Sequence, residues 1–574
     1  MNLFLIKTIK EISQLLDEKR ISSVELTKEV FRRVKEVEPK VKAFITLCEK
    51  EALEQAKESD KRIANGKRLS AIDGIPISIK DIFCTKDIKT TVGSNMLSDF
   101  VPPYDATVAK RLKEAGAVII GKNNLDAWAH GSSTENSDFF VTHNPWDLER
   151  VPGGSSGGSA AAVSSGMGFA SFGTDTGGSI RQPAALCGVT GLKPTYGRNS
   201  RYGVIAMASS LDCPGIFARS AEDIATYLEI VCGKDSLDST TVPNKKFDSK
   251  RISNFQSASW RTISKQFSSS NSQISNLKLG IPKEYFGKGL DPKVKEKVME
   301  AVEVYKKMGA KIVEISLPNY DYALAAYYII QPAEVSSNLA RFDGIKYGYS
   351  TEKFPISNFQ FPKKSQISNL KSQTLLDVYN LSRAQGFGDE AKRRIMIGTY
   401  VLSAGYYDAY YKKAMRVRTL VCNDFKKAFQ KVDAIITPTA PTAAFRIGEK
   451  SADPLEMYMQ DIYTVSANIA GIPGVSVPCG FVKNPSIGDR LSSIATSSVD
   501  RFSTNPPVGG RNTKDVTNDT RRTANNDSLF SKLPVGLQIL GPQFSEEMIL
   551  GLANAYQSKT NFHKETPDII KKNK

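Results

Sequence analysis

Histidine is scarce in this chain of 574 residues, which contains only His130, His143 and His563. Most metal sites and much acid–base catalysis in proteins use histidine, so this scarcity narrows the mechanisms open to the chain. The seven cysteines are scattered, their number is odd, and no two of them form a C-x-x-C pair. We therefore expect neither a disulfide framework nor a structural zinc site.

Long apolar runs are missing as well. The longest, Tyr322 to Ile330, has nine residues and is far too short to span a bilayer. The apolar start, Met1 to Ile6, is too short for a signal peptide, so we expect a cytoplasmic protein. Hydrophobic residues make up 40% and charged residues 24%, which is typical of a globular chain and excludes a disordered or collagenous one.

The net charge of +17 suggests RNA binding until its location is considered. The stretches 244–278, 352–371 and 484–532 carry +6, +3 and +2, which leaves +6 on the rest of the chain. All three are rich in Ser, Asn and Thr, and the first two share the words ISNFQ and SQISNLK. We interpret them as surface insertions, and the excess charge as a solvated basic surface.

The order of the predicted elements indicates an α/β fold. Residues 1–70 show helical spacing of apolar residues, and Ser22 and Glu25 form the capping box that opens a helix. Isoleucines then alternate with other residues over 75–80, which predicts a strand that ends at Lys80. Helical and strand patterns alternate again from 279 onward, which predicts a mixed sheet within one large domain over 71–574.

Three segments carry residues suited to catalysis: Gly74–Asp81 (GIPISIKD), Pro152–Ser159 (PGGSSGGS) and Gly173–Pro183 (GTDTGGSIRQP). Glycines allow several backbone N–H groups to converge, and such groups at 176–179 would stabilise an oxyanion beside the hydroxyl of Ser179. A serine nucleophile needs a base, and these segments contain no histidine. Lys80 lies among isoleucine and phenylalanine residues. Burial of Lys80 among these apolar neighbours would lower its pKa enough for that role.

Other interpretations of these glycines are weaker. Gly153 to Gly157 matches the G-x-S-x-G nucleophile elbow, but that fold needs a downstream histidine. The only one is His563, in a polar C-terminal tail. A phosphate-binding loop needs G-x-x-x-x-G-K-[ST], which is absent from these segments. A plain Gly/Ser loop would explain one segment, but not all three together.

The three segments, in this order and spacing, resemble the amidase signature family. The resemblance implies an amidase-signature fold, in which helices cover a mixed central β-sheet within a single large domain, here 71–574 after an N-terminal helical region. It also implies a Ser–cis-Ser–Lys triad, with Ser179 as nucleophile, Ser155 as the bridging serine in a cis peptide and Lys80 as base. The implied oxyanion hole consists of backbone N–H groups of Thr176, Gly177, Gly178 and Ser179.

Further motifs at 131–137, 341–349 and 404–413 are similar to the glutamine-hydrolysing members that serve tRNA-dependent amidotransferases. In those members an arginine and an aspartate recognise the α-carboxylate and α-amine of glutamine. The matching positions here are Arg394 and Asp461. The chemistry agrees, because a guanidinium binds a carboxylate in bidentate fashion and a carboxylate attracts an ammonium.

The resemblance implies a function within a larger assembly. The chain would release ammonia from glutamine for converting Glu-tRNA(Gln) to Gln-tRNA(Gln), or Asp-tRNA(Asn) to Asn-tRNA(Asn). It would form a heterotrimer with amidotransferase subunits B and C, in which the B subunit binds most of the charged tRNA and uses ATP and Mg²⁺. No cofactor or metal is expected in this chain, and no membrane partner.

Two alternatives from the residues stay open. One is a free-standing amidase that hydrolyses small amides. The other is a non-catalytic RNA-binding or scaffold subunit, against which the intact Lys80, Ser155 and Ser179 argue. The chain also departs from the family pattern at three places outside the triad. They are His130, where the family usually has an apolar residue, Pro214, which is displaced within DCPGI, and Ser466, which stands in place of a proline.

Overall fold

Among the residues that the structure describes, a mixed sheet of 11 strands runs in the order β1-β3-β2-β4-β6-β5-β10-β11-β9-β7-β8. The computed structural model describes residues 3–242, 247–253, 274, 277–287, 289–351, 374–451, 453–484 and 531–571. This sheet confirms the predicted α/β class. Its strands are β1 (Phe44–Leu47), β2 (Pro76–Lys80), β3 (Val118–Asn123), β4 (Ala170–Thr174), β5 (Thr190–Lys193), β6 (Pro214–Ala218), β7 (Lys278–Pro282), β8 (Lys311–Ile315), β9 (Ala434–Pro438), β10 (Gly474–Asn484) and β11 (Ser531–Leu540).

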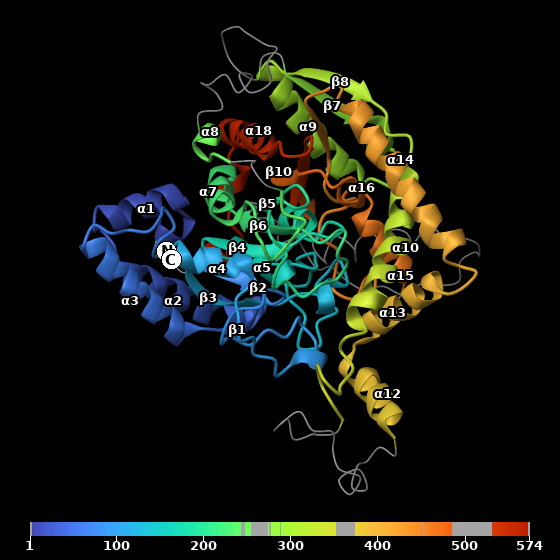
Figure 1. The fold of residues 1–574 in the computed structure, drawn as a ribbon. Helices are drawn as coiled ribbons and strands as arrows, with labels where there is room; N and C mark the ends of the chain where they lie inside the picture. Colours follow the sequence, from blue (N-terminus) through green and yellow to red (C-terminus); the bar gives the residue numbers. More distant parts are fainter. Residues whose placement is uncertain are drawn as a thin grey trace, which may run out of the picture.

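Helices cover the sheet, so every residue of the central strands β2, β3 and β4 is buried. The first three helices lie on one side of the molecule, and α10, α13 and α14 lie together on the other (Figure 1). None of the helices in the described ranges combines the length and apolarity needed to cross a bilayer. The helices are α1 (Ile9–Asp17), α2 (Ser23–Val41), α3 (Glu49–Ala64), α4 (Thr107–Glu114), α5 (Gly157–Ser164), α6 (Arg181–Cys187), α7 (Ala221–Val231), α8 (Lys250–Ser253), α9 (Pro292–Lys307), α10 (Tyr320–Leu339), α12 (Leu375–Gly386), α13 (Asp389–Leu402), α14 (Lys413–Ala428), α15 (Pro454–Tyr458), α16 (Val465–Ala470), α18 (Glu546–Lys559) and α19 (Asp568–Lys571).

Local sequence signals account for the N-terminal elements. The predicted capping box opens α2, since the Ser22 hydroxyl accepts from the Glu25 N–H at 3.1 Å and the Glu25 carboxylate accepts from the Ser22 N–H at 2.9 Å. The alternating isoleucines form β2, which ends at Lys80 as predicted. Strands β3 and β4 flank β2 in parallel, so the carboxyl ends of all three strands lie at one edge of the sheet.

Most residues of the three predicted insertions lie outside the described residues. Part of the first does not behave as a free surface loop, because helix α8 packs against α7 and α18 and buries Ile252. The third insertion joins β10 to β11, which pair as an antiparallel hairpin from Gly474 opposite Leu540 to Asn484 opposite Ser531. The late strand predicted from the sequence therefore forms and pairs despite the insertion.

Candidate active site

The three predicted catalytic segments meet where the parallel strands end. Lys80 is the last residue of β2, and the loop 175–180 follows its neighbour β4. Ser155 precedes α5, a helix that packs against β2, β3 and β4. Residues far apart in the chain thus come to one edge of the sheet.

Lys80 is fully buried and surrounded by hydroxyl groups. Its ammonium nitrogen donates to the side-chain oxygens of Ser155 at 2.7 Å, Ser156 at 2.9 Å and Thr174 at 3.0 Å. Burial lowers the pKa of Lys80 to about 7, although the carboxylates of Asp126 and Asp212 oppose the shift. A large fraction of Lys80 is therefore neutral near neutral pH, as a general base requires.

The two predicted serines lie on adjoining loops. The Gly154–Ser155 peptide bond is cis, as the resemblance implied. The N–H of Ser156 donates to the carbonyl of Ser179 at 3.3 Å, which ties the two loops together. Ser155 is fully buried, whereas Ser179 keeps a small exposed fraction of 7%. Ser179, which is proposed to attack the substrate, is thus the one of the two serines that remains accessible to solvent.

The backbone of loop 176–179 presents its N–H groups away from the protein's own acceptors. The Gly177 carbonyl accepts from the Thr464 hydroxyl at 2.6 Å, and the Gly178 carbonyl accepts from the Gln182 N–H at 2.9 Å. In a trans peptide the next N–H points opposite to such a carbonyl, so the N–H groups of Gly178 and Ser179 face the other way. In the described part of the chain, neither of these N–H groups has an acceptor. This arrangement suits an oxyanion hole.

A buried ion pair closes this loop at its base. Arg181 donates to the Asp175 carboxylate through Nη2 at 2.9 Å and Nε at 3.0 Å, and both side chains are fully buried. Asn468 donates to the same carboxylate at 2.8 Å. Burial would raise the pKa of Asp175, but the Arg181 guanidinium outweighs it and holds this pKa at about 2. A single charge pair therefore joins the two ends of the loop between Asp175 and Arg181.

The predicted carboxylate-binding residue, Arg394, lies in α13 and is almost fully buried. It donates to Glu390 at 2.8 Å and to the side-chain carbonyl of Gln331 at 2.7 Å. Its guanidinium carbon lies 5.3 Å from the ring centroids of both Tyr328 and Tyr458. These rings fix the guanidinium by cation–π contact and leave it beside α10.

The predicted amine-binding residue, Asp461, lies close to Arg394 through a shared tyrosine. The hydroxyl of Tyr328, whose ring contacts Arg394, donates to Asp461 at 2.8 Å. Ser132 donates to the other carboxylate oxygen at 2.8 Å. Burial raises the pKa of Asp461 to about 7, and the two hydroxyl donors only partly offset that effect. An ammonium group bound there would stabilise the ionised carboxylate.

Hydrogen bonds connect these two residues to the catalytic loops. Thr464, one turn after Asp461, donates to the Gly177 carbonyl at 2.6 Å. The carbonyl of Ser132 accepts from Gln182 at 2.9 Å, and the Gln182 side-chain oxygen accepts from the Gly154 N–H at 3.0 Å. Asp461 is thus connected to the cis-serine loop through Ser132 and Gln182, and the predicted catalytic and recognition residues belong to one site.

Sequence reasoning missed three residues of this site. Ser156 and Thr174 accept hydrogen bonds from Lys80, and Tyr328 connects Arg394 to Asp461. Ser156 and Thr174 lie within the glycine-rich segments 152–159 and 173–183, and this position was the only signal that the sequence offered for them. Tyr328 lies within the apolar run of α10, where a tyrosine is indistinguishable from core packing.

The three departures from the family pattern fall at different distances from this site. Pro214 begins β6, close to Asp212, whose carboxylate accepts from the Thr176 hydroxyl at 2.8 Å. The Ser466 hydroxyl shares a hydrogen bond of 2.5 Å with Tyr285 inside the core. His130 is buried, and neither of its ring nitrogens has a hydrogen-bond partner among the described residues.

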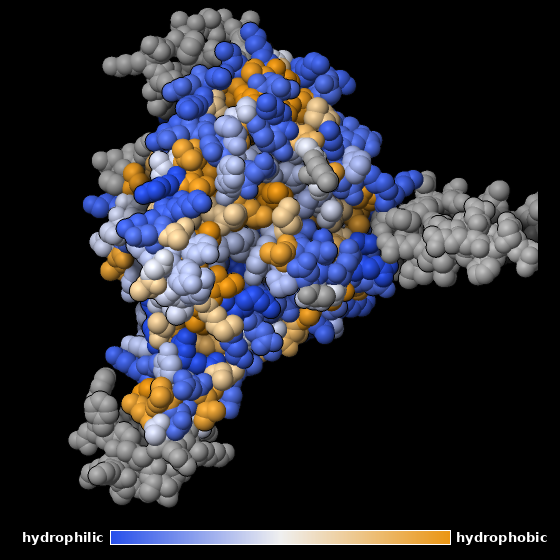
Figure 2. Space-filling view, turned by 90° about the vertical axis from the view of Figure 1, so that its right-hand side faces the viewer, coloured by the Kyte–Doolittle hydropathy of each residue, from blue (hydrophilic) through white to orange (hydrophobic). Residues whose placement is uncertain are grey.

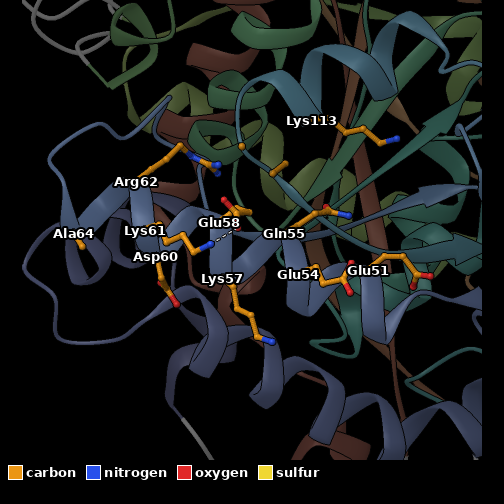
Figure 3. A pocket seen from close by; sticks show the side chains of 12 residues that line it. Glu51, Glu54, Gln55, Lys57, Glu58, Asp60, Lys61, Arg62, Ala64 and Lys113 are labelled. Carbon is orange, nitrogen blue, oxygen red and sulfur yellow. Dashed lines mark hydrogen bonds and ion pairs between the residues drawn. The ribbon is translucent and has the colours of Figure 1, made fainter.

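A hollow on the surface lies elsewhere, along helix α3 (Figure 3). Its lining is mostly charged, includes the ion pair between Lys61 and Glu58, and contains none of the predicted site residues. In the described ranges no group of three or more His, Cys, Asp or Glu side chains is placed to hold a metal ion.

The fold and the comparisons with known proteins together define an amidase. The family model described as Amidase matches residues 25–550, and the chain belongs to this family. The family that the motifs predicted is therefore confirmed.

Relatives with established names match along nearly the whole chain. The A subunit of glutamyl-tRNA(Gln) amidotransferase from Heliobacterium modesticaldum is 46% identical over 98% of this chain and 99% of its own length. That of Sulfurihydrogenibium sp. is 47% identical over 98% and 99%. The crystal structure of the corresponding A subunit from Thermotoga maritima is 35% identical, with a TM-score of 0.69 over 99% of this chain and 98% of that one.

Proposed function

We propose that this chain is the glutamine-hydrolysing subunit of a tRNA-dependent amidotransferase. It releases ammonia, which a partner subunit uses to convert Glu-tRNA(Gln) to Gln-tRNA(Gln), or Asp-tRNA(Asn) to Asn-tRNA(Asn). The observation that carries the proposal is the hydrogen bond from buried Lys80 to Ser155, beside a loop with unpaired N–H groups in the described part of the chain. The names of the full-length relatives support the substrate and the assembly.

In the proposed reaction, Ser179 attacks the side-chain amide carbon of glutamine. Its proton passes through Ser155 to neutral Lys80, and the N–H groups at 176–179 hold the developing oxyanion. The C–N bond then breaks, and the relayed proton leaves on the nitrogen as ammonia. Water attacks the acyl-Ser179 ester, with Lys80 again taking the proton through Ser155, and glutamate leaves.

Substrate selection would rest on the paired charges of Arg394 and Asp461. Arg394 binds the α-carboxylate of glutamine and Asp461 binds its α-ammonium. The shared contact with Tyr328 holds the two groups at a fixed spacing. A ligand that carries both an anion and a cation fits this spacing better than a simple amide does.

The partners would be amidotransferase subunits B and C, and the B subunit would bind most of the tRNA and use ATP and Mg²⁺. Large apolar side chains are exposed on α12, on α13, which carries Arg394, and on α15 and just after it. Figure 2 shows the face that carries α13 and α14, with an apolar group on α12 at its lower end. Exposed apolar side chains of this kind favour protein contact. They are Leu375, Leu376, Leu381, Met396, Ile397, Tyr400, Leu455 and Met459. We place the complex in the cytoplasm, where charged tRNA is used.

The test is ammonia release from glutamine by the purified chain, alone and with its partner subunits, charged tRNA and ATP. We expect weak activity alone and a strong rise in the complex. Ser179→Ala should abolish ammonia release in both settings, while its melting temperature stays near that of the wild type.

Retained ammonia release in Ser179→Ala would contradict the mechanism. Vigorous activity of the chain alone, unaffected by partners and extended to small amides, would instead indicate a free-standing amidase.

A further inference from the structure

Gln331 presents an amide donor without an acceptor next to Arg394. It lies in α10, and its side chain is fully buried. Its side-chain oxygen accepts from Arg394 Nη1 at 2.7 Å, but its Nε2 has no partner among the described residues. A guanidinium only donates, so the amide cannot be turned around to exchange these roles. The NH₂ group must therefore find an acceptor elsewhere.

His130 brings a second unpaired polar group to the same neighbourhood. Its side chain is 1% exposed, and both ring nitrogens lack a partner in the described part of the chain. It precedes Ser132 by two residues, and the Ser132 hydroxyl binds Asp461. Burial and the charge of Arg394 hold the pKa of His130 well below its ordinary range, so the ring stays neutral and has one N–H to donate.

Buried polar groups are costly when unpaired, and native proteins leave few of them. One such group contacts the buried Arg394, and the other lies two residues before Ser132, which binds Asp461; their position at the recognition residues indicates a ligand rather than a packing defect. The ligand must supply acceptor atoms to the Gln331 amide and the His130 N–H, and negative charge to Arg394. A carboxylate meets both conditions, because it accepts several hydrogen bonds and pairs with a guanidinium.

We propose that Gln331 and His130 are further substrate-binding residues, which donate hydrogen bonds to the substrate carboxylate that Arg394 attracts. The inference rests on the proposed function, because that carboxylate is the α-carboxylate of glutamine. Both donors are neutral, so they add selectivity for a carboxylate without adding charge. They would discriminate glutamine from amides that lack the carboxylate.

The test compares two substrates in the assembled complex. One is glutamine, and the other is 4-aminobutanamide, which is glutamine without its carboxylate. In Gln331→Leu and in His130→Leu we expect the KM for glutamine to rise about tenfold, while kcat changes less than about threefold. The kcat/KM for 4-aminobutanamide should not change. His563→Leu is the matched control, because His563 also has an unpaired ring nitrogen among the described residues but lies in the C-terminal segment.

A second variant distinguishes a loss of substrate binding from a loss of folding. Gln331→Glu keeps the shape and the acceptor for Arg394 but removes the NH₂ group and adds a negative charge. It should raise the KM for glutamine more than Gln331→Leu does, with an unchanged melting temperature. Equal losses on both substrates, or an unchanged KM in all variants, would overturn the inference. The second of these results would mean that water satisfies both groups.

A binding measurement separates this inference from the proposed function. If the wild-type complex releases no ammonia from glutamine, the proposed function fails. Calorimetric titration of Ser179→Ala with glutamine still tests carboxylate binding without turnover. Weaker binding after Gln331→Leu or His130→Leu in this background supports the inference, and unchanged binding overturns it.

Discussion

At the scale of single residues, the site depends on what burial does to ionisable groups. Lys80 is surrounded by three hydroxyl acceptors, and among the described residues no carboxylate forms an ion pair with its ammonium. Burial therefore dominates, and the pKa of Lys80 falls to about 7. Arg394 is almost as deeply buried but keeps its charge, because Glu390 lies in contact with it. Desolvation therefore allows Lys80 to act as a base, whereas Arg394 remains a cation.

The lowered pKa of Lys80 predicts a pH dependence of glutamine hydrolysis. Below pH about 7 the lysine is protonated and cannot accept a proton, so kcat/KM should fall about tenfold for each pH unit. Above that pH the rate should level off. The measurement is kcat/KM between pH about 5.5 and about 8.5, with melting temperatures at each pH. A flat profile over this range would exclude Lys80 as the base, and Lys80→Arg should be inactive throughout.

Arg394→Ala tests the glutamine specificity of the site. Loss of a charge-assisted bond to the α-carboxylate should raise the KM for glutamine about 100-fold, while hydrolysis of a simple amide such as propionamide is spared. Arg393→Ala is the matched control, because Arg393 contacts the same Glu390 but its side chain is 41% exposed. Comparable losses on both amides would favour a free-standing amidase, or a structural role for Arg394.

At the scale of elements, the loop between β4 and α6 depends on the pair formed by Asp175 and Arg181. Arg181 also donates to Gln538 at 2.7 Å and to the carbonyl of Thr464 at 3.1 Å. One guanidinium therefore joins the catalytic loop, strand β11 and the segment that leads into α16. A buried charge in this position fixes the geometry of the loop. Its desolvation costs free energy, which is offset only when all of its hydrogen-bond and ion-pair partners are present.

Removing one partner of this pair should be strongly destabilising. We expect Arg181→Met to lower the free energy of unfolding by about 3–5 kcal/mol, because the Asp175 carboxylate stays buried without its cation. The measurement is chemical denaturation of the purified chain. Arg446→Met is the control, since the ion pair of Arg446 with Glu149 is exposed and should contribute less than about 1 kcal/mol. A loss for Arg181→Met as small as that of the control would contradict this account.

At the scale of the whole molecule, one sheet organises the chain despite its insertions. Strands from both halves of the sequence meet in the middle of the sheet, where β5 pairs with β10 and β10 with β11. The pairing of β10 and β11 continues to Asn484 and Ser531, at the two ends of the third insertion. Closing a long loop costs little more than closing a short one, so the hairpin tolerates the extra chain.

Deletion of residues 490–528 should therefore leave the fold intact. Both strands of the hairpin and all residues of the candidate site remain, so we expect a melting temperature within about 2 °C of the wild type and unchanged glutaminase activity. Leu537→Asp, which buries a charge in β11, serves as the positive control for a damaged hairpin. A collapse of the melting transition on deletion would show that the insertion packs against the body.

Much of this protein is determined locally and can be predicted from its sequence. The alternation that ends at Lys80 predicts strand β2, the pattern at Ser22 predicts the start of α2, and the glycine-rich words indicate the family and its catalytic loops. Each of these signals lies within a short stretch of chain. The α8 segment, predicted to lie in a surface insertion, packs against α7 and α18, and its few apolar residues gave no sign in the sequence that they would do so.

Only the tertiary structure decided which side chains surround the reacting groups. Thr174 reaches Lys80 because β4 lies beside β2, and Tyr328 and Gln331 reach Arg394 because α10 packs against α13. Within α10 these side chains look like ordinary core residues, since sequence periodicity shows which face is buried but not what that face contacts. The residues of the predicted triad, and Arg394 and Asp461 with them, were therefore indicated by the resemblance to the family, whereas the side chains around Arg394 emerged only from the packing of distant helices.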